Sequence, residues 1–155
     1  MYNGYMELTR SNRRRAKSLP LLDYKALAEM RYQIRRFLHF SEQVVRSAGI
    51  EPQQHQLLLA LRGQPGRQAG IGVLAERLRI QHHSAVELVD RLVDRGLVSR
   101  SRSPSDRRQV LVHLTAHGEG ELEKLAKCHL DELRNNGPAL VEALEAVIRR
   151  NDGTN

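Results

Sequence analysis

The side chains in this sequence that are best suited to a chemical task are arginines gathered in one short stretch. Four arginines and one aspartate fall within nine residues, namely Arg100, Arg102, Asp106, Arg107 and Arg108. A guanidinium is always charged and has several donors, so it suits phosphate oxygens and the negative potential of a narrow DNA minor groove. The stretch therefore indicates contact with a polyanion. The alternative is an ordinary exposed hairpin with a weak ion pair.

The charge of the whole chain is concentrated in two segments. The 155 residues contain 25 Lys and Arg against 18 Asp and Glu, which gives +7 with neutral histidines. Residues 1–19 have a net charge of +4 and residues 97–110 of +3, so these two segments match the whole excess. A positive charge that is gathered locally is typical of a nucleic-acid footprint, whereas a small excess by itself only favours solubility.

A second group of polar side chains begins a predicted helix over residues 82–96. One face of this helix is apolar at helical spacing, with Ala85, Leu88, Val89 and Leu92, and Gly96 is placed to end it. The polar side chains off that face are His82, His83, Ser84, Glu87 and Arg91. The N-terminal end of a recognition helix enters the major groove, so we expect the first four to contact bases and Arg91 a phosphate. The alternative is a solvated face that contacts nothing.

The segments around this helix predict a winged helix-turn-helix. Residues 71–78 have a helical pattern, and residues 79–81 form a short break before the next helix. After Gly96, an extended run begins at Leu97, and an alternating run over 109–114 completes a hairpin with the basic stretch at its tip. Arg79 lies in the turn, where a positive φ costs a residue other than glycine about 1 kcal/mol.

Two parts of this segment form a distinctive pattern. The run Leu-Val-Asp-Arg-Leu-Val-Asp-Arg-Gly-Leu-Val occupies 88–98, and Ser-Asp-Arg-Arg at 105–108 precedes Leu-Thr at 114–115. The pattern resembles the multiple-antibiotic-resistance regulator (MarR) family, over roughly residues 24–150. The resemblance implies a dimeric, ligand-responsive transcription factor. It also implies that Asp106 orients Arg108 into a minor groove, and we expect the other three wing arginines to meet phosphates.

Long amphipathic helices are predicted on both sides of the winged segment. Asp23 suits the N-cap of a helix over 23–48, Pro52 begins a second helix to about Arg62, and a loop over 63–70 follows. Thr115 suits the cap of a helix over 116–134, and Asn-Asn-Gly-Pro at 135–138 predicts a break before a last helix over 138–149. The apolar stripes run along these helices, so a second chain is expected to cover them.

The predicted fold class is mainly α, a winged helix-turn-helix with a small β-hairpin wing and a helical dimerisation region. Residues 23–150 form one domain, with the winged part at 53–115 and dimerisation helices at 23–48 and 116–150. Residues 1–22 form a basic N-terminal extension, either a flexible arm or a short extra helix.

The histidines and the single cysteine give weaker indications of a binding or sensing site. His39 and His55 are placed to line a cavity beside the long helix and are candidates for ligand binding, with a structural role as the alternative. Zinc needs three or four converging ligands, and no such spacing is present, so we expect no metal site and no cofactor. Cations near Cys128 favour its thiolate, but a lone cysteine on an amphipathic helix is usually inert.

The predicted function is a ligand-responsive, sequence-specific DNA-binding transcriptional regulator, a homodimeric repressor on a pseudo-palindromic operator. Its partners are double-stranded DNA, a second copy of the chain and a small-molecule effector. No catalytic residues are expected, because the sequence has no nucleophile–base motif, phosphate loop or dinucleotide fingerprint. One cysteine and no apolar run of membrane length indicate a cytoplasmic protein without a membrane span. The alternatives are a winged-helix protein-interaction module and a thiol- or metal-sensing regulator of the same fold.

Overall fold

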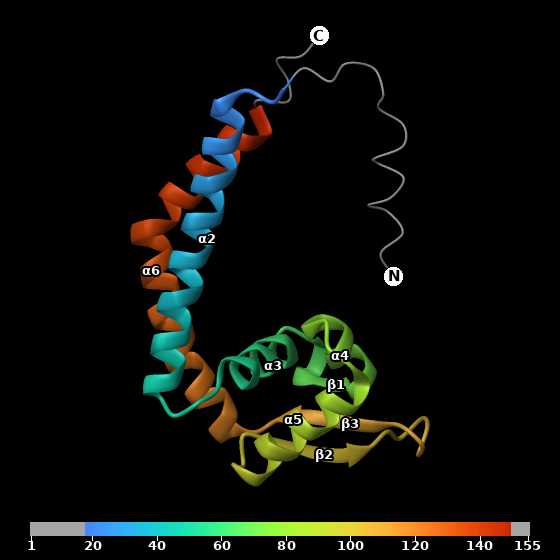
Figure 1. The fold of residues 1–155 in the computed structure, drawn as a ribbon. Coiled ribbons are helices and arrows are strands. Elements are labelled where there is room, and N and C mark those ends of the chain that lie inside the picture. Colours follow the sequence, from blue (N-terminus) through green and yellow to red (C-terminus); the bar gives the residue numbers. More distant parts are fainter. Residues whose placement is uncertain (1–17, 150–155) are drawn as a thin grey trace, which may run out of the picture. The chain divides into compact units, whose positions relative to one another are not determined.

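The computed structural model describes residues 18–149 of the chain, as nine elements in sequence order (Figure 1). They are α2 (Leu21–Ser47), α3 (Pro52–Arg62), the 3-10 helix η1 (Pro65–Arg67), β1 (Gln68–Gly70), α4 (Ile71–Leu78), α5 (His82–Asp94), β2 (Val98–Arg102), β3 (Val110–Leu114) and α6 (Ala116–Arg149). The chain divides into two compact units, one over 35–138 and one formed by 1–34 with 139–155. Most of the predicted basic extension, residues 1–17, lies outside the described residues.

The unit over 35–138 contains the winged helix-turn-helix that the sequence predicts. Helices α3, α4 and α5 enclose a core with an antiparallel sheet in the strand order β1-β3-β2. In β2 and β3, Arg100 lies opposite Val112, and Arg102 lies opposite Val110. The fully buried core side chains come from every one of these helices and from β2 and β3, namely Leu57, Leu58, Leu61, Leu74, Val89, Leu92, Val98 and Val112. The core therefore fixes α5 against both the sheet and the neighbouring helices.

The sheet has a third strand that the sequence analysis places in a loop. Residues 68–70 form β1, which pairs with β3 so that Ala69 lies opposite Val112. Three residues are too few to show the alternation by which strands are recognised, and two glycines and a proline precede or end this segment. Ala69 is buried, so packing on the core determines this strand rather than local preference.

Of the two central helices, α4 ends where the sequence predicts and α5 ends slightly earlier. Helix α4 ends at Leu78, as predicted, and Arg79 follows it with a φ of +56°. The N–H groups of Arg79 and Ile80 donate to the carbonyls of Glu76 and Ala75, the arrangement that normally has glycine at this position. Helix α5 ends at Asp94, two residues before the predicted end, and Gly96 has the expected positive φ of +68°.

Both long helices differ from the sequence expectation at one point. Helix α2 begins at Leu21, and Asp23 lies within its first turn, where its N–H donates to the carbonyl of Pro20, so Asp23 is not the N-cap. Helix α6 continues from Ala116 to Arg149 through the predicted break, with Pro138 inside it. A proline removes one backbone hydrogen bond, and here the flanking turns keep helical geometry, with Asn136 donating from Nδ2 to Glu132 Oε1 at 2.9 Å. Within residues 18–149, no helix is both long and apolar enough to cross a membrane.

The start of α6 is fixed against the end of α5. Thr115 is the predicted cap: its Oγ1 accepts the N–H of Gly118 at 3.0 Å and donates to the carbonyl of Gly96 at 2.7 Å. Gly118 lies so close to the neighbouring backbone that a Cβ added to it would be 2.0 Å from the carbonyl oxygen of Leu97. Only a residue without a side chain fits between these two segments.

Replacing Gly118 with alanine is expected to destabilise the winged unit by about 3 kcal/mol or more, because backbone rather than a flexible side chain must move. Thermal unfolding at a fixed protein concentration measures this loss. The matched variant is Gly120→Ala in the same helix, where an added Cβ meets nothing within 4 Å. That change should raise stability by about 0.5–1 kcal/mol. Equal melting temperatures for Gly118→Ala and the parent chain would contradict the close contact.

Candidate nucleic-acid interface and a buried histidine pair

The N-terminal end of α5 presents the polar side chains that the sequence analysis singles out. His82, His83 and Glu87 are exposed, and Ser84 is half-buried, while Ala85, Leu88, Val89 and Leu92 of α5 are buried. The residue before the helix, Gln81, makes no side-chain capping hydrogen bond. The first N–H groups of α5 are therefore not capped by Gln81 and suit an anion as well as water.

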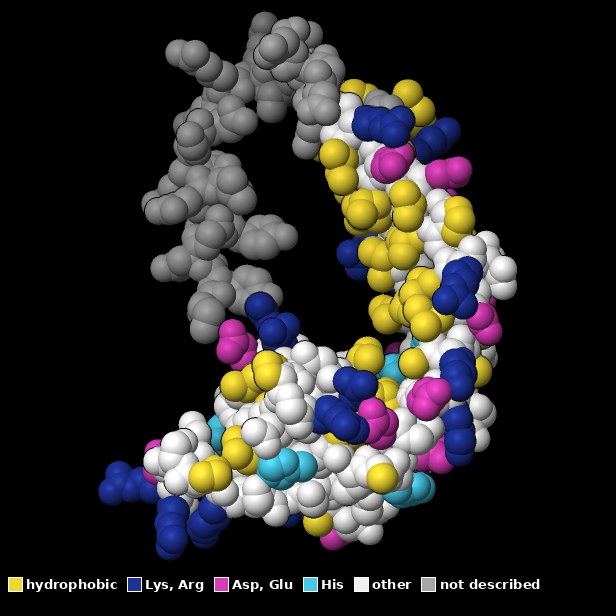
Figure 2. Space-filling view, turned by 180° about the vertical axis from the view of Figure 1, so that it is seen from behind, with side chains coloured by type: hydrophobic (Ala, Val, Ile, Leu, Met, Phe, Trp, Pro, Cys, Tyr) yellow, Lys and Arg dark blue, Asp and Glu magenta, His cyan; other side chains and the backbone are white. Residues whose placement is uncertain are grey.

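Hydrogen bonds order the tip of the wing. Asp106 accepts the backbone N–H of Arg108 with Oδ1 at 3.0 Å, and its carbonyl accepts the N–H of Gln109 at 2.9 Å. Arg102 donates from Nη1 to the carbonyl of Arg107 at 2.8 Å, so one of the wing arginines supports the turn. Asp106 thus positions Arg108 through the backbone, where the family resemblance implies a contact with its side chain. The arginines at the tip are exposed, and Figure 2 shows basic side chains gathered there.

Two of the candidate arginines have carboxylate partners on α5. Arg91 lies 3.8 Å from Glu87, one helical turn away. Arg100, on β2, forms an ion pair with Asp90 through its Nη2. These contacts show that the positive charge of the two arginines is partly compensated within the winged unit itself.

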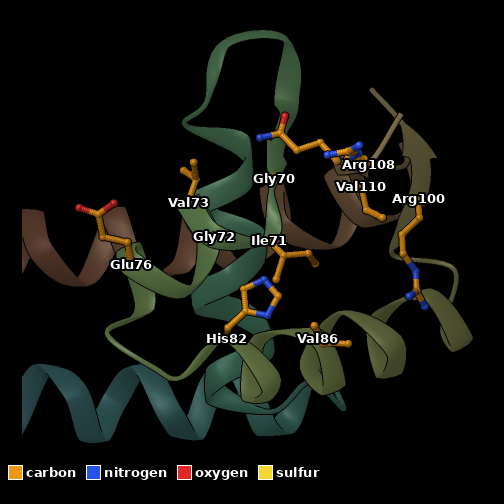
Figure 3. Close-up of a pocket in the computed structure, with 11 residues that line it drawn as sticks. Gly70, Ile71, Gly72, Val73, Glu76, His82, Val86, Arg100, Arg108 and Val110 are labelled. Carbon is orange, nitrogen blue, oxygen red and sulfur yellow. The ribbon is translucent and has the colours of Figure 1, made fainter. Parts of the chain in front are cut away.

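A groove of about 700 Å³ joins α4, the start of α5 and the wing (Figure 3). Arg100 and Arg108 reach it from the wing, and His82 lies beside Ile71 at its other side. Its remaining lining residues are Gly70, Gly72, Val73, Glu76, Val86, Gln109 and Val110. The structure thus brings α5 and wing residues to one groove. The contribution of α4 was missed, because small and apolar residues at a helix start give no chemical signal in a sequence.

A second candidate site is a cluster of rings in the unit over 35–138. His55 on α3 stacks on His129 of α6, with ring centroids 4.9 Å apart and planes at 29°. Phe37 and Phe40 of α2 meet His129 edge-on at 6.1 and 6.2 Å. Both histidines are 8% exposed, and Nε2 of His129 is buried without a hydrogen-bond partner. The cluster therefore contains a buried polar atom that has no hydrogen-bond partner within the described residues.

The other sensing candidates lie apart from this cluster. His39 is exposed on α2, and the histidine that lies beside His55 is His129 of α6, which the sequence analysis did not single out. Cys128 is exposed on α6. Within the described part of the chain, no group of three or more His, Cys, Asp or Glu side chains is arranged to hold a metal ion.

The histidine pair predicts loss of stability in mild acid. Burial, and then the neighbouring His129, lower the pKa of His55 from 6.5 to about 4. Between these values the unfolded chain binds more protons, so stability is full above about pH 6.5 and falls toward pH 4 by at most about 3 kcal/mol. Urea unfolding from pH 7 to pH 4 measures this slope. His55→Phe should flatten it, whereas His39→Gln, at an exposed histidine, should not. An unchanged slope in His55→Phe would refute the assignment.

Comparison with known proteins agrees with the winged architecture. A family model described as the MarR family matches residues 48–109. Among solved structures, a MarR family transcriptional regulator from Streptomyces coelicolor in complex with DNA has a TM-score of 0.68 and 24% identity, covering 86% of this chain and 88% of that one. At that identity the likeness shows the fold. CouR from Rhodococcus jostii, bound to p-coumaroyl-CoA, has a TM-score of 0.56 and 26% identity, covering 64% of this chain and 69% of that one.

A sequence relative extends the match beyond the winged segment. The putative transcriptional regulatory protein for the hcr operon of Thauera aromatica is 30% identical over 118 residues, which cover 76% of this chain and 70% of that protein. The relatives are transcription regulators rather than enzymes. The match to this relative and to the family model, together with the three-stranded winged fold, shows that the chain belongs to the MarR family of DNA-binding transcriptional regulators.

Proposed function

We propose that this chain is a homodimeric, ligand-responsive repressor that occupies a pseudo-palindromic operator. The observation that carries the proposal is the shared groove, which His82 at the start of α5 lines together with Arg100 and Arg108 of the wing. A helix N-terminus with exposed polar side chains suits a major groove, and an arginine-rich hairpin suits the minor groove beside it. Repression would follow from occlusion of a promoter.

Each exposed group has a role in this arrangement. His82, His83, Ser84 and Glu87 are placed at the end of α5 that enters the major groove, and Arg91 is nearer the phosphate backbone. On the wing, Arg108 enters the minor groove, and the other wing arginines, Arg102 and Arg107, lie toward phosphates.

A binding titration tests the proposal. A labelled duplex from the DNA upstream of the gene is titrated by fluorescence anisotropy, with a shuffled duplex of the same composition beside it. A sequence-specific regulator should prefer the first duplex by a factor of about 1,000 or more at physiological salt. Equal affinity for both duplexes would show that the chain binds DNA by charge alone, without sequence specificity. No binding to either would favour the alternative of a protein-interaction module.

The wing turn predicts a difference between two substitutions of Asp106. Asp106→Ala removes the acceptor for the N–H of Arg108, so the tip loses order and operator binding should weaken about fivefold to tenfold, although a negative charge near DNA is removed. Asp106→Asn also removes the charge but keeps an acceptor oxygen, so binding should equal or exceed that of the parent chain. Tighter binding by Asp106→Ala than by Asp106→Asn would show that the turn contact has no role.

Homodimerisation is proposed from the unit formed by 1–34 and 139–155. Its described part joins the start of α2 to the end of α6 and exposes many large apolar side chains, as Figure 2 shows. Those exposed by two fifths or more are Leu19, Leu21, Leu22, Tyr24, Leu27, Tyr32, Ile34, Val141, Leu144 and Ile148. Apolar stripes of this extent usually mark an interface between chains.

Sedimentation at micromolar concentration should therefore give about twice the chain mass of 17.7 kDa. Leu144→Glu places a charge in the proposed interface and should shift the species toward the monomer, because a buried unpaired charge is costly. Leu59→Glu is the matched control, since Leu59 is similarly exposed but belongs to the other unit. A monomeric parent chain would contradict both the dimer and the palindromic operator, because two half-sites need two winged units.

A small-molecule effector is the last part of the proposal. The cluster of His55 and His129 offers an apolar, ring-lined setting with one unsatisfied nitrogen, which supports a site for a planar molecule that can share a hydrogen bond. His39, exposed on the same long helix as the phenylalanines, is kept as a second ligand candidate. Release from DNA then requires that the effector bind better to the conformation that cannot occupy both half-sites.

A further inference from the structure

The two DNA-facing elements of the winged unit have opposite charge. Helix α5 contains three carboxylates, Glu87, Asp90 and Asp94, and one guanidinium, Arg91, which gives −2 with neutral histidines. The segment 97–110 that forms the wing has +3. A helix of net negative charge repels the phosphate backbone when it enters a groove, so the carboxylates of α5 have to be compensated.

The structure shows which cations compensate two of them, Glu87 and Asp90. Arg91 lies 3.8 Å from Glu87 within α5, so this pair belongs to the helix alone. Asp90 is compensated from outside the helix, by Arg100 of β2. Asp90 lies one turn after Val86, which lines the groove together with Arg100. The Asp90 carboxylate is therefore near the groove in which the wing arginines lie.

The pair of Asp90 and Arg100 is too exposed to be explained by stability. The side chains are 48% and 39% exposed, and exposed ion pairs contribute little to folding. The same pair can affect DNA binding more strongly than folding, because a charge within about 10 Å of DNA phosphates is incompletely screened at 0.1 M salt. Without its cation, the Asp90 carboxylate would repel the DNA phosphates on that side of the duplex.

We propose that Arg100 is an internal counter-ion that neutralises Asp90 for DNA binding, and that it is not itself a phosphate contact. The inference rests on the proposed placement of α5 and the wing on DNA. It assigns the two groove arginines different roles. Arg108 lies at the exposed tip, and its backbone is held by Asp106, so its guanidinium meets DNA. Arg100 already has a carboxylate partner. It serves as a positioning residue that lowers the electrostatic repulsion between α5 and the DNA phosphates.

A double-mutant cycle on the full-length chain tests the assignment, with operator affinity measured from 50 to 300 mM KCl. Arg100→Gln removes the cation that pairs with Asp90 and should weaken operator binding about tenfold at 100 mM salt. Asp90→Asn in the Arg100→Gln background removes that carboxylate and should restore the affinity to within about twofold of the parent, with an unchanged salt slope. Asp90→Asn alone frees a guanidinium and should tighten binding. Arg108→Gln is the control for a direct contact and should reduce the salt slope by about 1.

The opposite result is equally definite. If Arg100 binds a phosphate, the double variant stays weak and its salt slope falls by about 1, as with Arg108→Gln. If Arg100→Gln has no effect on affinity, Asp90 needs no counter-ion and the proposal is also wrong. Circular dichroism and melting of each variant verify the fold, which an exposed pair should not disturb. A parent chain that binds no operator would instead refute the proposed function, so the two failures are distinct.

Discussion

The winged unit depends on one close approach of backbone to backbone, between Leu97 and Gly118. Leu97 is buried, its N–H donates to the carbonyl of Leu92 at the end of α5, and its own carbonyl accepts the N–H of Thr115 before α6. One residue thus joins the end of α5 to the start of α6. Helix α5 has 13 residues and is about 20 Å long, so a rotation of about 5° at this end would move its other end by about 2 Å. The positions of the His82 and His83 side chains therefore depend on how firmly the other end of α5 is held.

Charge is divided between elements in a way that a count over the chain conceals. The net excess of +7 suggests a uniformly attractive surface, yet α5 is acidic and the wing is basic. Attraction and orientation then have separate sources. In the proposed complex, the wing and its long-range field attract the duplex, whereas α5 contributes short-range contacts and has two of its three carboxylates, Glu87 and Asp90, paired with arginines. In that proposed arrangement, affinity for any DNA and preference for one sequence depend on different side chains.

Much of the fold follows from local patterns, and the exceptions have physical causes. The bounds of α3 and α4, the cap at Thr115 and the end at Gly96 depend on residues that are close in sequence. Strand β1 depends on its pairing with the distant β3, which no short window contains, and α6 continues through Pro138 although the residues around it favour a break. For the candidate site, residue types alone were enough to single out the wing arginines and the polar side chains at the start of α5. The partner of Arg100 could not be predicted, because Asp90 lies on another element and the packing of α5 against β2 brings the two side chains together.

The left-handed Arg79 has a consequence for how the winged unit folds. A residue other than glycine in this conformation costs about 1–2 kcal/mol, and helices as short as the eight residues of α4 have little stability of their own in water. The turn between α4 and α5 is thus opposed by local preference and exists because Leu74, Val89 and Leu92 are buried around it. A peptide of α4 and α5 alone would lack that compensation. The geometry of the turn that positions α5 is therefore a cooperative property, present only when the sheet and α3 have also folded.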